Sequence, residues 1–269
     1  MLLVEPAIHM GVDPKMILKQ ARGMMKRRDG WSSRSDVEAW IQKNPYYKNW
    51  DPRTISRFVE YGFIEDEQPA DGEVPKLRSK TPPMIEVTYL YRPNLGAAGS
   101  KGPYTAEQKA EVPDIHPNAK LRTPVYRPEG PIAFNMLPSV RPSVQFILGG
   151  SSGYSAPEIQ TARFELTGTG VGGNGGQELE RVKQHFVKGG QHTIPVDKNL
   201  DEVASVAAQW IGQEHSRWTD MEETAQRDWD SAPRNIKTQV DQKMAGAIKE
   251  WNGENWIGSD AQKKLMPKL

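Results

Sequence analysis

The spacing of hydrophobic residues divides the chain into stretches of different character. Residues 14–63 carry apolar positions three and four apart and predict three consecutive helices. Residues 64–135 are rich in proline, glycine and charge, and only the β-rich run 85–91 within them predicts a strand. Two short apolar runs, residues 2–8 and residues 143–148, predict buried strands. A compact core is therefore expected only in parts of the chain.

A further strand is predicted immediately before a histidine. Residues 181–198 contain a strand, a Gly-Gly turn, His192 and an apolar stretch with a proline. The helix expected next has its apolar positions at Val203, Val206, Ala207, Trp210 and Ile211. A histidine on a loop at the C-terminal end of a strand is held by a rigid scaffold and can face a cleft. His192 is therefore the strongest candidate among the five histidines, although a lone histidine is more often a surface or packing residue.

The chain from residue 213 onward is polar and predicted to be helical. Its clearest predicted helix begins near Pro233 and has an apolar stripe made of Ile236, Val240, Met244, Ala247, Ile248 and Trp251. Such a stripe has to pack on the rest of the protein or on a partner.

Composition excludes several kinds of chemistry. The 269 residues include no cysteine, which excludes disulfides, cysteine-bound zinc and a thiol nucleophile. The formal net charge is +1, so the chain as a whole does not attract nucleic acid electrostatically. No apolar run approaches the ~20 residues that a membrane-spanning helix needs. No metal-binding histidine pattern occurs, so we expect neither a metal nor another cofactor.

Two glycine-containing motifs match known signatures without their usual context. Residues 149–153 match Gly-x-Ser-x-Gly with Ser151 at the centre, but residues 154–157 delay the helix that a nucleophile elbow needs. Residues 168–173 match Gly-x-Gly-x-x-Gly, but no βαβ unit surrounds them. We interpret the first as a strand-end loop and the second as a flexible loop.

The order of several segments is similar to fungal α/β-hydrolases of the toxin-biosynthesis and peroxisomal-lipase group. The segments that carry the resemblance are Leu-Leu-Val-Glu5-Pro, residues 27–31 through 50–53, Val59-Glu-Tyr-Gly62, residues 146–155 and Gly189-Gly-Gln-His192. The resemblance implies an α/β fold class: the C-terminal part of an α/β-hydrolase, with a mostly parallel sheet, a helical cap insertion and a C-terminal helical extension. It also implies that the first five strands, the oxyanion hole and the nucleophilic serine are not contained in this chain.

The resemblance assigns candidate roles to three residues. His192 corresponds to the general base of a Ser-acid-His triad. The acid is either Glu5, which follows the first strand, or Glu158, which follows the strand 143–148. We favour Glu5 and keep Glu158 as the alternative.

The same resemblance divides the chain into four parts. Residues 1–9 contribute a core strand, residues 10–135 a helical cap with a Pro/Gly-rich insertion, residues 136–212 the C-terminal core with the histidine loop, and residues 213–269 a helical tail. The implied function is that of the C-terminal portion of a serine-type hydrolase acting on an ester, thioester or lipid-like acyl substrate. The alternative is a non-catalytic, degenerate hydrolase fragment or binding protein.

The last three residues give a hint of localisation. Pro267-Lys268-Leu269 resembles the peroxisomal Ser-Lys-Leu address, with proline in place of the small residue. We therefore expect a peroxisomal protein that binds an import receptor through this end, with a cytoplasmic location as the alternative. The other expected partner is a small-molecule acyl substrate, with no nucleic acid and no membrane span.

Overall fold

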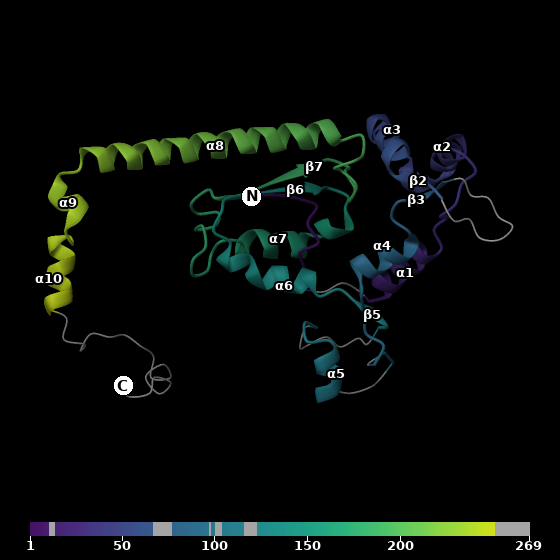
Figure 1. The fold of residues 1–269 in the computed structure, drawn as a ribbon, viewed down its shortest axis with the longest axis horizontal. Coiled ribbons are helices and arrows are strands. Elements are labelled where there is room, and N and C mark those ends of the chain that lie inside the picture. The colour runs from purple at the N-terminus through teal and green to yellow at the C-terminus, as the bar shows by residue number, and fades with distance from the viewer. Residues whose placement is uncertain (11–13, 67–76, 97, 100–103, 116–122, 251–269) are drawn as a thin grey trace. The chain divides into compact units, whose positions relative to one another are not determined.

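A computed structural model of the chain describes residues 1–10, 14–66, 77–96, 98–99, 104–115 and 123–250. It contains two compact units, Met1–Ile211 and Gly212–Leu269. The first unit holds a parallel sheet with helices on both faces and a separate helical cap (Figure 1).

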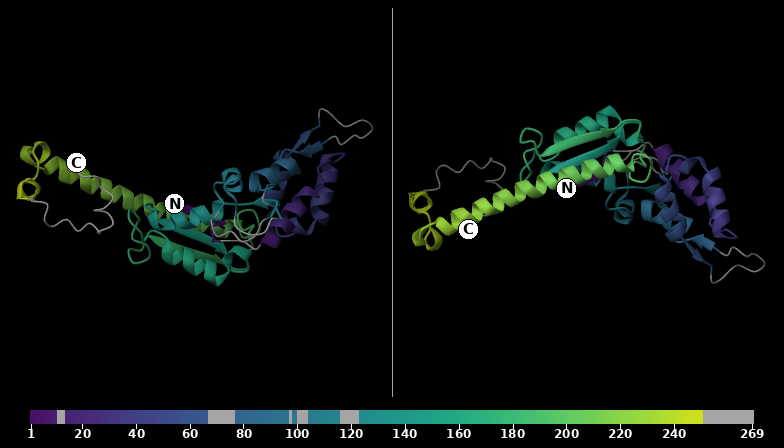
Figure 2. Two further views of the ribbon diagram at one scale, coloured as in Figure 1. Left: turned by 90° about the horizontal axis from the view of Figure 1, so that it is seen from below. Right: turned by 90° about the horizontal axis from the view of Figure 1, so that it is seen from above.

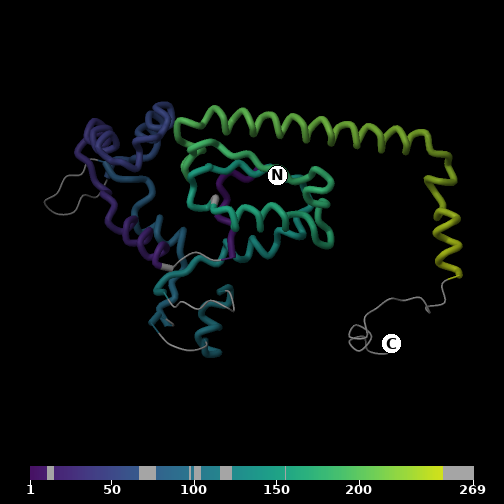
Figure 3. The backbone as a smooth tube through the Cα atoms, turned by 180° about the vertical axis from the view of Figure 1, so that it is seen from behind, coloured from purple at the N-terminus to yellow at the C-terminus, as the bar shows by residue number. Residues whose placement is uncertain are grey.

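The sheet consists of β1 (Leu2–Val4), β6 (Val144–Gly149) and β7 (Val182–Val187), in the order β1-β6-β7. All of its strands are parallel, and Phe146 of the central strand lies opposite Leu3 on one side and Gln184 on the other. Every residue of β6 is buried, as expected for a strand covered on both faces. The N-terminal segment lies beside the central strand (Figure 3). The predicted α/β class with a parallel sheet is confirmed.

A helix packs on each face of this sheet. On one face, Phe164 of α7 (Pro157–Leu166) packs against a cluster that includes Phe146 and Val182. On the other face, Val203 near the start of α8 (Leu200–Ser231) joins a cluster whose buried members also include Ile147, Val187 and Ile194. Burial of these apolar side chains supplies the main stabilisation of the sheet at about 25 cal/mol per Å².

The cap has a core of its own. The cap consists of α1 (Pro14–Met25), α2 (Arg34–Lys43), the 3-10 turn η1 (Pro45–Tyr47), α3 (Pro52–Tyr61) and the antiparallel pair β2 (Phe63–Glu65) and β3 (Leu77–Ser79). Figure 2 shows this strand pair beside α2 and α3. The buried members of the core are Trp31, Val37, Ile41, Tyr47, Val59, Phe63 and Leu77. The helices predicted within residues 14–63 are therefore present, and together they bury an aromatic cluster.

The predicted strand at residues 85–91 is wrong, because most of this segment forms the helix α4 (Pro83–Leu90). Pro83 sits in the first helical turn, where a proline is tolerated, and Thr88 Oγ1 donates to the Met84 carbonyl at 3.0 Å. An ion pair of 2.7 Å between Glu86 and Arg27 links the segment to the end of α1. Packing against a neighbouring helix thus overrides the β propensity of the sequence.

The rest of residues 64–135 has more regular structure than the sequence predicted. It contains α5 (Ala106–Glu111), the start of α6 (Glu129–Met136), and an antiparallel pair formed by β4 (Arg92–Pro93) and β5 (Val125–Tyr126). Two further 3-10 turns, η2 (Leu137–Ser139) and η3 (Gly153–Ser155), flank β6. The loop at residues 168–173 contains no helix or strand, in agreement with its interpretation as a loop.

The predicted helix beginning near Pro233 is interrupted. It consists of α9 (Arg234–Thr238) and α10 (Gln242–Glu250), and Trp251 lies outside the described residues. All five described members of its predicted stripe are exposed, namely Ile236, Val240, Met244, Ala247 and Ile248. Among the helices that the structure describes, none combines the length and the apolar character needed to cross a bilayer.

We predict that Trp31→Ala destabilises the cap by about 3–5 kcal/mol, the usual cost of truncating a buried tryptophan. Trp31 is 2% exposed and lies edge-on to Trp40 and Phe63, with ring centroids 5.2 and 4.9 Å away. Urea unfolding followed by circular dichroism measures the loss. Met25→Ala, at a side chain that is 69% exposed, is the control and should change stability by less than about 0.5 kcal/mol. Equal effects of the two substitutions would contradict the assigned cap core.

Candidate active site

The carboxylate of Glu5 lies at the end of β1, inside the protein. The backbone of Glu5 is left-handed, with φ of 47°, and its N–H donates to the Ile147 carbonyl at 2.9 Å. A residue with a β-carbon rarely adopts this conformation, which costs on the order of 1–3 kcal/mol. The turn directs the side chain toward the end of β6, where it is 2% exposed.

Three groups hydrogen bond to this carboxylate. The Gly149 N–H donates to Oε1, and the Ser152 hydroxyl donates to Oε2 at 2.5 Å. Nδ1 of His192 lies 2.9 Å from the same Oε2. These partners come from the end of β6, the loop that follows it and the loop that follows β7. The structure therefore brings together Glu5 and His192, which lie near opposite ends of the first unit's sequence.

These partners also determine the protonation of Glu5. Burial acts to raise the pKa of the carboxyl, but the hydrogen bonds from His192, Ser152 and Gly149 outweigh it, and the net pKa is lowered. The carboxyl is therefore ionised at neutral pH. An ionised carboxylate can only accept hydrogen bonds, so Nδ1 of His192 carries the proton of their shared bond.

Glycines allow the histidine loop to approach the sheet. Gly189 has φ of +69°, which glycine adopts without strain. At Gly149 an added β-carbon would lie 2.6 Å from the Gln191 carbonyl oxygen and 2.7 Å from that of Gly190. Beyond the histidine, fully buried Ile194 anchors the loop in the core. The Gly-Gly turn that preceded His192 in the sequence thus has a geometric function.

This geometry leaves the second ring nitrogen of His192 available. With the proton on Nδ1, Nε2 carries the free lone pair, and the side chain as a whole is 53% exposed. A histidine oriented by a buried carboxylate, with an accessible Nε2, can take a proton from a hydroxyl and later return it. The contact between Glu5 and His192 thus has the geometry that the predicted roles of acid and base require.

The other acid candidate lies elsewhere. Glu158 is exposed in the first turn of α7, and no contact between it and His192 is found among the described residues. An acidic residue in the first turn of a helix interacts favourably with the helix dipole, which accounts for Glu158 without a catalytic role. The geometry thus favours Glu5, and the assignment of either residue as the catalytic acid stays a prediction.

Ser151, at the centre of the Gly-x-Ser-x-Gly match, does not form a nucleophile elbow. It is exposed on a turn, and its backbone N–H donates to the Gly190 carbonyl at 2.9 Å. The next α-helix begins only at Pro157, after the 3-10 turn η3. Among the described non-glycine residues, positive φ occurs at Glu5 and Glu180, so Ser151 lacks the strained backbone of an elbow.

Sequence reasoning missed three residues around the pair. Ser152 binds the Glu5 carboxylate, and the ring of Tyr154 lies 4.6 Å from the His192 ring. Arg163 of α7 is 1% exposed and donates to the carbonyls of Pro6 (2.8 Å) and Tyr154 (2.9 Å). Ser152 and Tyr154 lie within the segment 146–155 that carries the family resemblance, but no role was predicted for them, and no motif marks Arg163.

His9 lies on the other side of Tyr154, with stacked rings 5.9 Å apart. Its burial, reinforced by the charges of Arg127 and Arg163, lowers the pKa of its imidazole, so it is neutral at neutral pH. No group of three or more metal-ligating side chains is found in the part of the chain that the structure describes.

Backbone pairing connects the cap to the histidine loop. The Asp51 N–H donates to the Val196 carbonyl at 3.0 Å, and the Lys198 N–H donates to the Asn49 carbonyl at 2.9 Å. Together they form a short antiparallel bridge between the segment preceding α3 and the segment following His192. The position of the cap therefore depends on the histidine loop.

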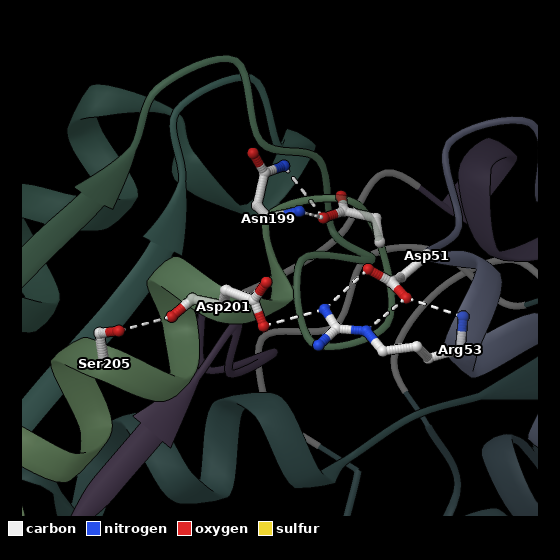
Figure 4. A network of polar contacts seen from close by, with 6 residues as sticks. Asp51, Arg53, Asn199, Asp201 and Ser205 are labelled. Carbon is white, nitrogen blue, oxygen red and sulfur yellow. Dashed lines mark hydrogen bonds and ion pairs between the residues drawn. The ribbon is translucent and has the colours of Figure 1, made fainter.

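Side chains extend this connection (Figure 4). Arg53 binds both carboxylate oxygens of Asp51 at 2.9 Å and reaches Asp201 of α8 at 2.9 Å. The hydrogen bonds from Arg53 lower the pKa of Asp51 to about 2. Buried Asp197 accepts two hydrogen bonds from Asn199, at 2.8 and 2.9 Å, and so fixes the start of α8.

Known proteins with a similar sequence are hydrolases. The chain is 28% identical over 252 residues to the type I acyl-CoA thioesterase mpaH of Penicillium roqueforti (strain FM164), covering 85% of this chain and 55% of that protein. The chain is similar in sequence to fungal acyl-CoA thioesterases. Two proteins of the same description from Penicillium brevicompactum are 26% and 27% identical, each over 85% of this chain and 54% of their own length. The predicted resemblance to fungal hydrolases is confirmed.

The match is partial in length. The chain spans about half the length of these relatives. Among solved structures, the peroxisomal alpha-beta-hydrolase Lpx1 from Saccharomyces cerevisiae aligns with a TM-score of 0.45 and 10% identity, over 87% of this chain and 55% of that one. No protein-family profile matches the chain.

We predict that Glu5 makes the stability of the chain depend on pH. The pKa of the Glu5 carboxyl in the folded chain is below its ordinary value of 4.5, so the stability that Glu5 contributes is fully present above about pH 4.5 and is lost as the pH falls through the folded pKa. Glu5→Gln should lower stability at pH 7 by about 2 kcal/mol, the cost of losing hydrogen bonds to a charged acceptor. It should also flatten the pH dependence below pH 5. Thermal unfolding between pH 3 and pH 7 measures both effects.

The control is Glu202→Gln, at the exposed pair of His185 and Glu202, whose nitrogen and oxygen are 2.8 Å apart. An exposed pair contributes about 0–1 kcal/mol, so its loss should leave the pH profile nearly unchanged. Identical profiles for wild type and Glu5→Gln would contradict a buried, ionised Glu5.

Proposed function

We propose that this chain supplies the acid and the base of a serine-type hydrolase that cleaves acyl thioesters or esters. Glu5 is the acid and His192 is the base, while the nucleophilic serine is not contained in this chain. The observation that carries the proposal is the 2.9 Å contact between Nδ1 of His192 and a carboxylate oxygen of buried Glu5.

The reaction follows from this geometry. Nε2 of His192 takes the proton of the serine hydroxyl as its oxygen attacks the acyl carbonyl carbon. The imidazolium is stabilised by Glu5 and returns the proton to the leaving thiolate or alkoxide, so that a thiol or alcohol departs and an acyl-serine ester remains. Water, deprotonated by the same nitrogen, then attacks this ester, which releases the carboxylic acid and restores the serine.

The relatives support an acyl thioester as the substrate class. They are described as acyl-CoA thioesterases, and the matched region extends over 85% of this chain. The cap is suited to covering an acyl group, because its segment at residues 49–53 is bonded directly to the loop that carries His192.

The test supplies a nucleophile from a relative. The chain is joined to the part of the Penicillium roqueforti thioesterase that it does not cover, and release of free thiol from acyl-CoA substrates is measured. His192→Ala should reduce kcat by about 10⁴-fold or more, the usual cost of losing the base of a triad, and Glu5→Gln should also reduce it strongly.

His185→Ala is the matched control, because His185 also pairs with a glutamate but both side chains of that pair are largely exposed, at 37% and 45%. It should retain near wild-type activity. Full activity of His192→Ala would refute the assignment.

The second candidate is a non-catalytic, hydrolase-like binding protein. It is favoured by Ser151, whose exposed turn lacks the features of an elbow. Incubation of the chain alone with a fluorophosphonate probe, followed by intact-mass measurement, tests the premise that both candidates share, namely that Ser151 is not an activated nucleophile. A stoichiometric adduct on Ser151 that disappears in His192→Ala would contradict both readings and make Ser151 the nucleophile.

The proposed location is the peroxisome, through Pro267-Lys268-Leu269, which lies outside the described residues. A fluorescent protein fused to the N-terminus should coincide with a peroxisomal marker in fungal cells. Deletion of Lys268 and Leu269 should disperse it, because the import receptor reads a free terminal tripeptide. A fusion that is cytoplasmic with the intact terminus would favour the cytoplasmic alternative.

A further inference from the structure

Ser152 occupies an unusual place beside the proposed acid and base. Its side chain is buried, with 7% of the residue exposed, and its hydroxyl donates to Oε2 of Glu5 at 2.5 Å. That oxygen is also the one that Nδ1 of His192 contacts at 2.9 Å. The hydroxyl and the imidazole therefore share a single carboxylate oxygen.

The same hydroxyl has a second contact. Its oxygen accepts a hydrogen bond from the Tyr154 backbone N–H at 3.2 Å, which caps the 3-10 turn η3. Tyr154 in turn places its ring 4.6 Å from the ring of His192. Ser152 thus acts on the histidine by two routes: through the carboxylate that binds the ring nitrogen, and through the turn that carries the neighbouring ring.

We propose that Ser152 is a positioning residue. Its hydroxyl holds the Glu5 carboxylate in the orientation that binds His192, and its hydrogen bond weakens the electrostatic attraction between that carboxylate and the imidazole. This inference rests on the proposed roles of Glu5 and His192. Because the hydroxyl donates to the carboxylate, Ser152 is not itself available to the base as a nucleophile. Two further titratable groups lie near this site. Arg163 of α7 interacts electrostatically with Glu5, and the ring of His9 stacks on that of Tyr154.

The consequence concerns the affinity of His192 for a proton. A carboxylate that already accepts a hydrogen bond from a hydroxyl stabilises a neighbouring imidazolium less than one that does not. Removal of the hydroxyl should therefore increase the proton affinity of His192. A base with too high an affinity is occupied by a proton at neutral pH, so Ser152 would keep the free base populated.

The experiment is an NMR pH titration of the histidine ring signals in the full chain, with the His192 signal identified by its loss in His192→Ala. Ser152→Ala should increase the proton-binding constant of His192 by about threefold or more. Ser152→Thr, which keeps the hydroxyl, should remain within about twofold of wild type. Ser151→Ala, at the exposed neighbour, should leave the titration unchanged.

Glu5→Gln separates this inference from the proposed function. It should decrease the proton-binding constant of His192 by about tenfold, because the imidazolium loses its carboxylate. If Glu5→Gln has this effect and Ser152→Ala has none, the role of Ser152 is refuted and the acid–base pair stands. If Glu5→Gln has no effect, the pairing and the role of Ser152 both fail. Should Ser152→Ala not fold, Ser152→Cys decides, since its weaker donor should give an increase of the same sign.

Discussion

The hydrogen bonds to the buried carboxylate of Glu5 are the interactions on which the arrangement at the C-terminal ends of the sheet strands depends. One ionised group receives hydrogen bonds from the end of β6, from the following loop and from the histidine loop. An ionised carboxylate without such partners is strongly destabilised in the protein interior. The folded state therefore requires β1, the end of β6 and the histidine loop to be in position at the same time. The stability of this part of the sheet and the orientation of His192 thus depend on the same hydrogen bonds.

The cap shares in this coupling. Its aromatic core folds around Trp31 and Tyr47, and the chain leaving that core pairs directly with the segment after His192. The cap and the segment that carries His192 therefore hydrogen bond directly to each other, although the cap has a hydrophobic core of its own.

The sequence predicted those features that depend on local pattern. The three sheet strands, the cap helices and the delay of a helix after Ser151 all follow from spacing and turn residues, and the structure contains them. The sequence did not predict the helix α4, because its β-branched residues favour a strand. The contact that holds this segment beside the end of α1 is seen only in the structure. Ser152, Tyr154 and Arg163 were missed because their roles arise from contacts between distant segments, which no local pattern encodes.

The pairing of Glu5 with His192 joins residues separated by 187 positions. During synthesis at about 5–20 residues per second, Glu5 emerges roughly 10–40 s before its partner does. Until β6 and Ser152 have also emerged, the carboxylate lacks the strand and the hydrogen-bond donors that surround it in the folded unit. The contact between Glu5 and His192 forms later still, and a nascent chain that stalls before β7 (Val182–Val187) has the buried carboxylate without its histidine.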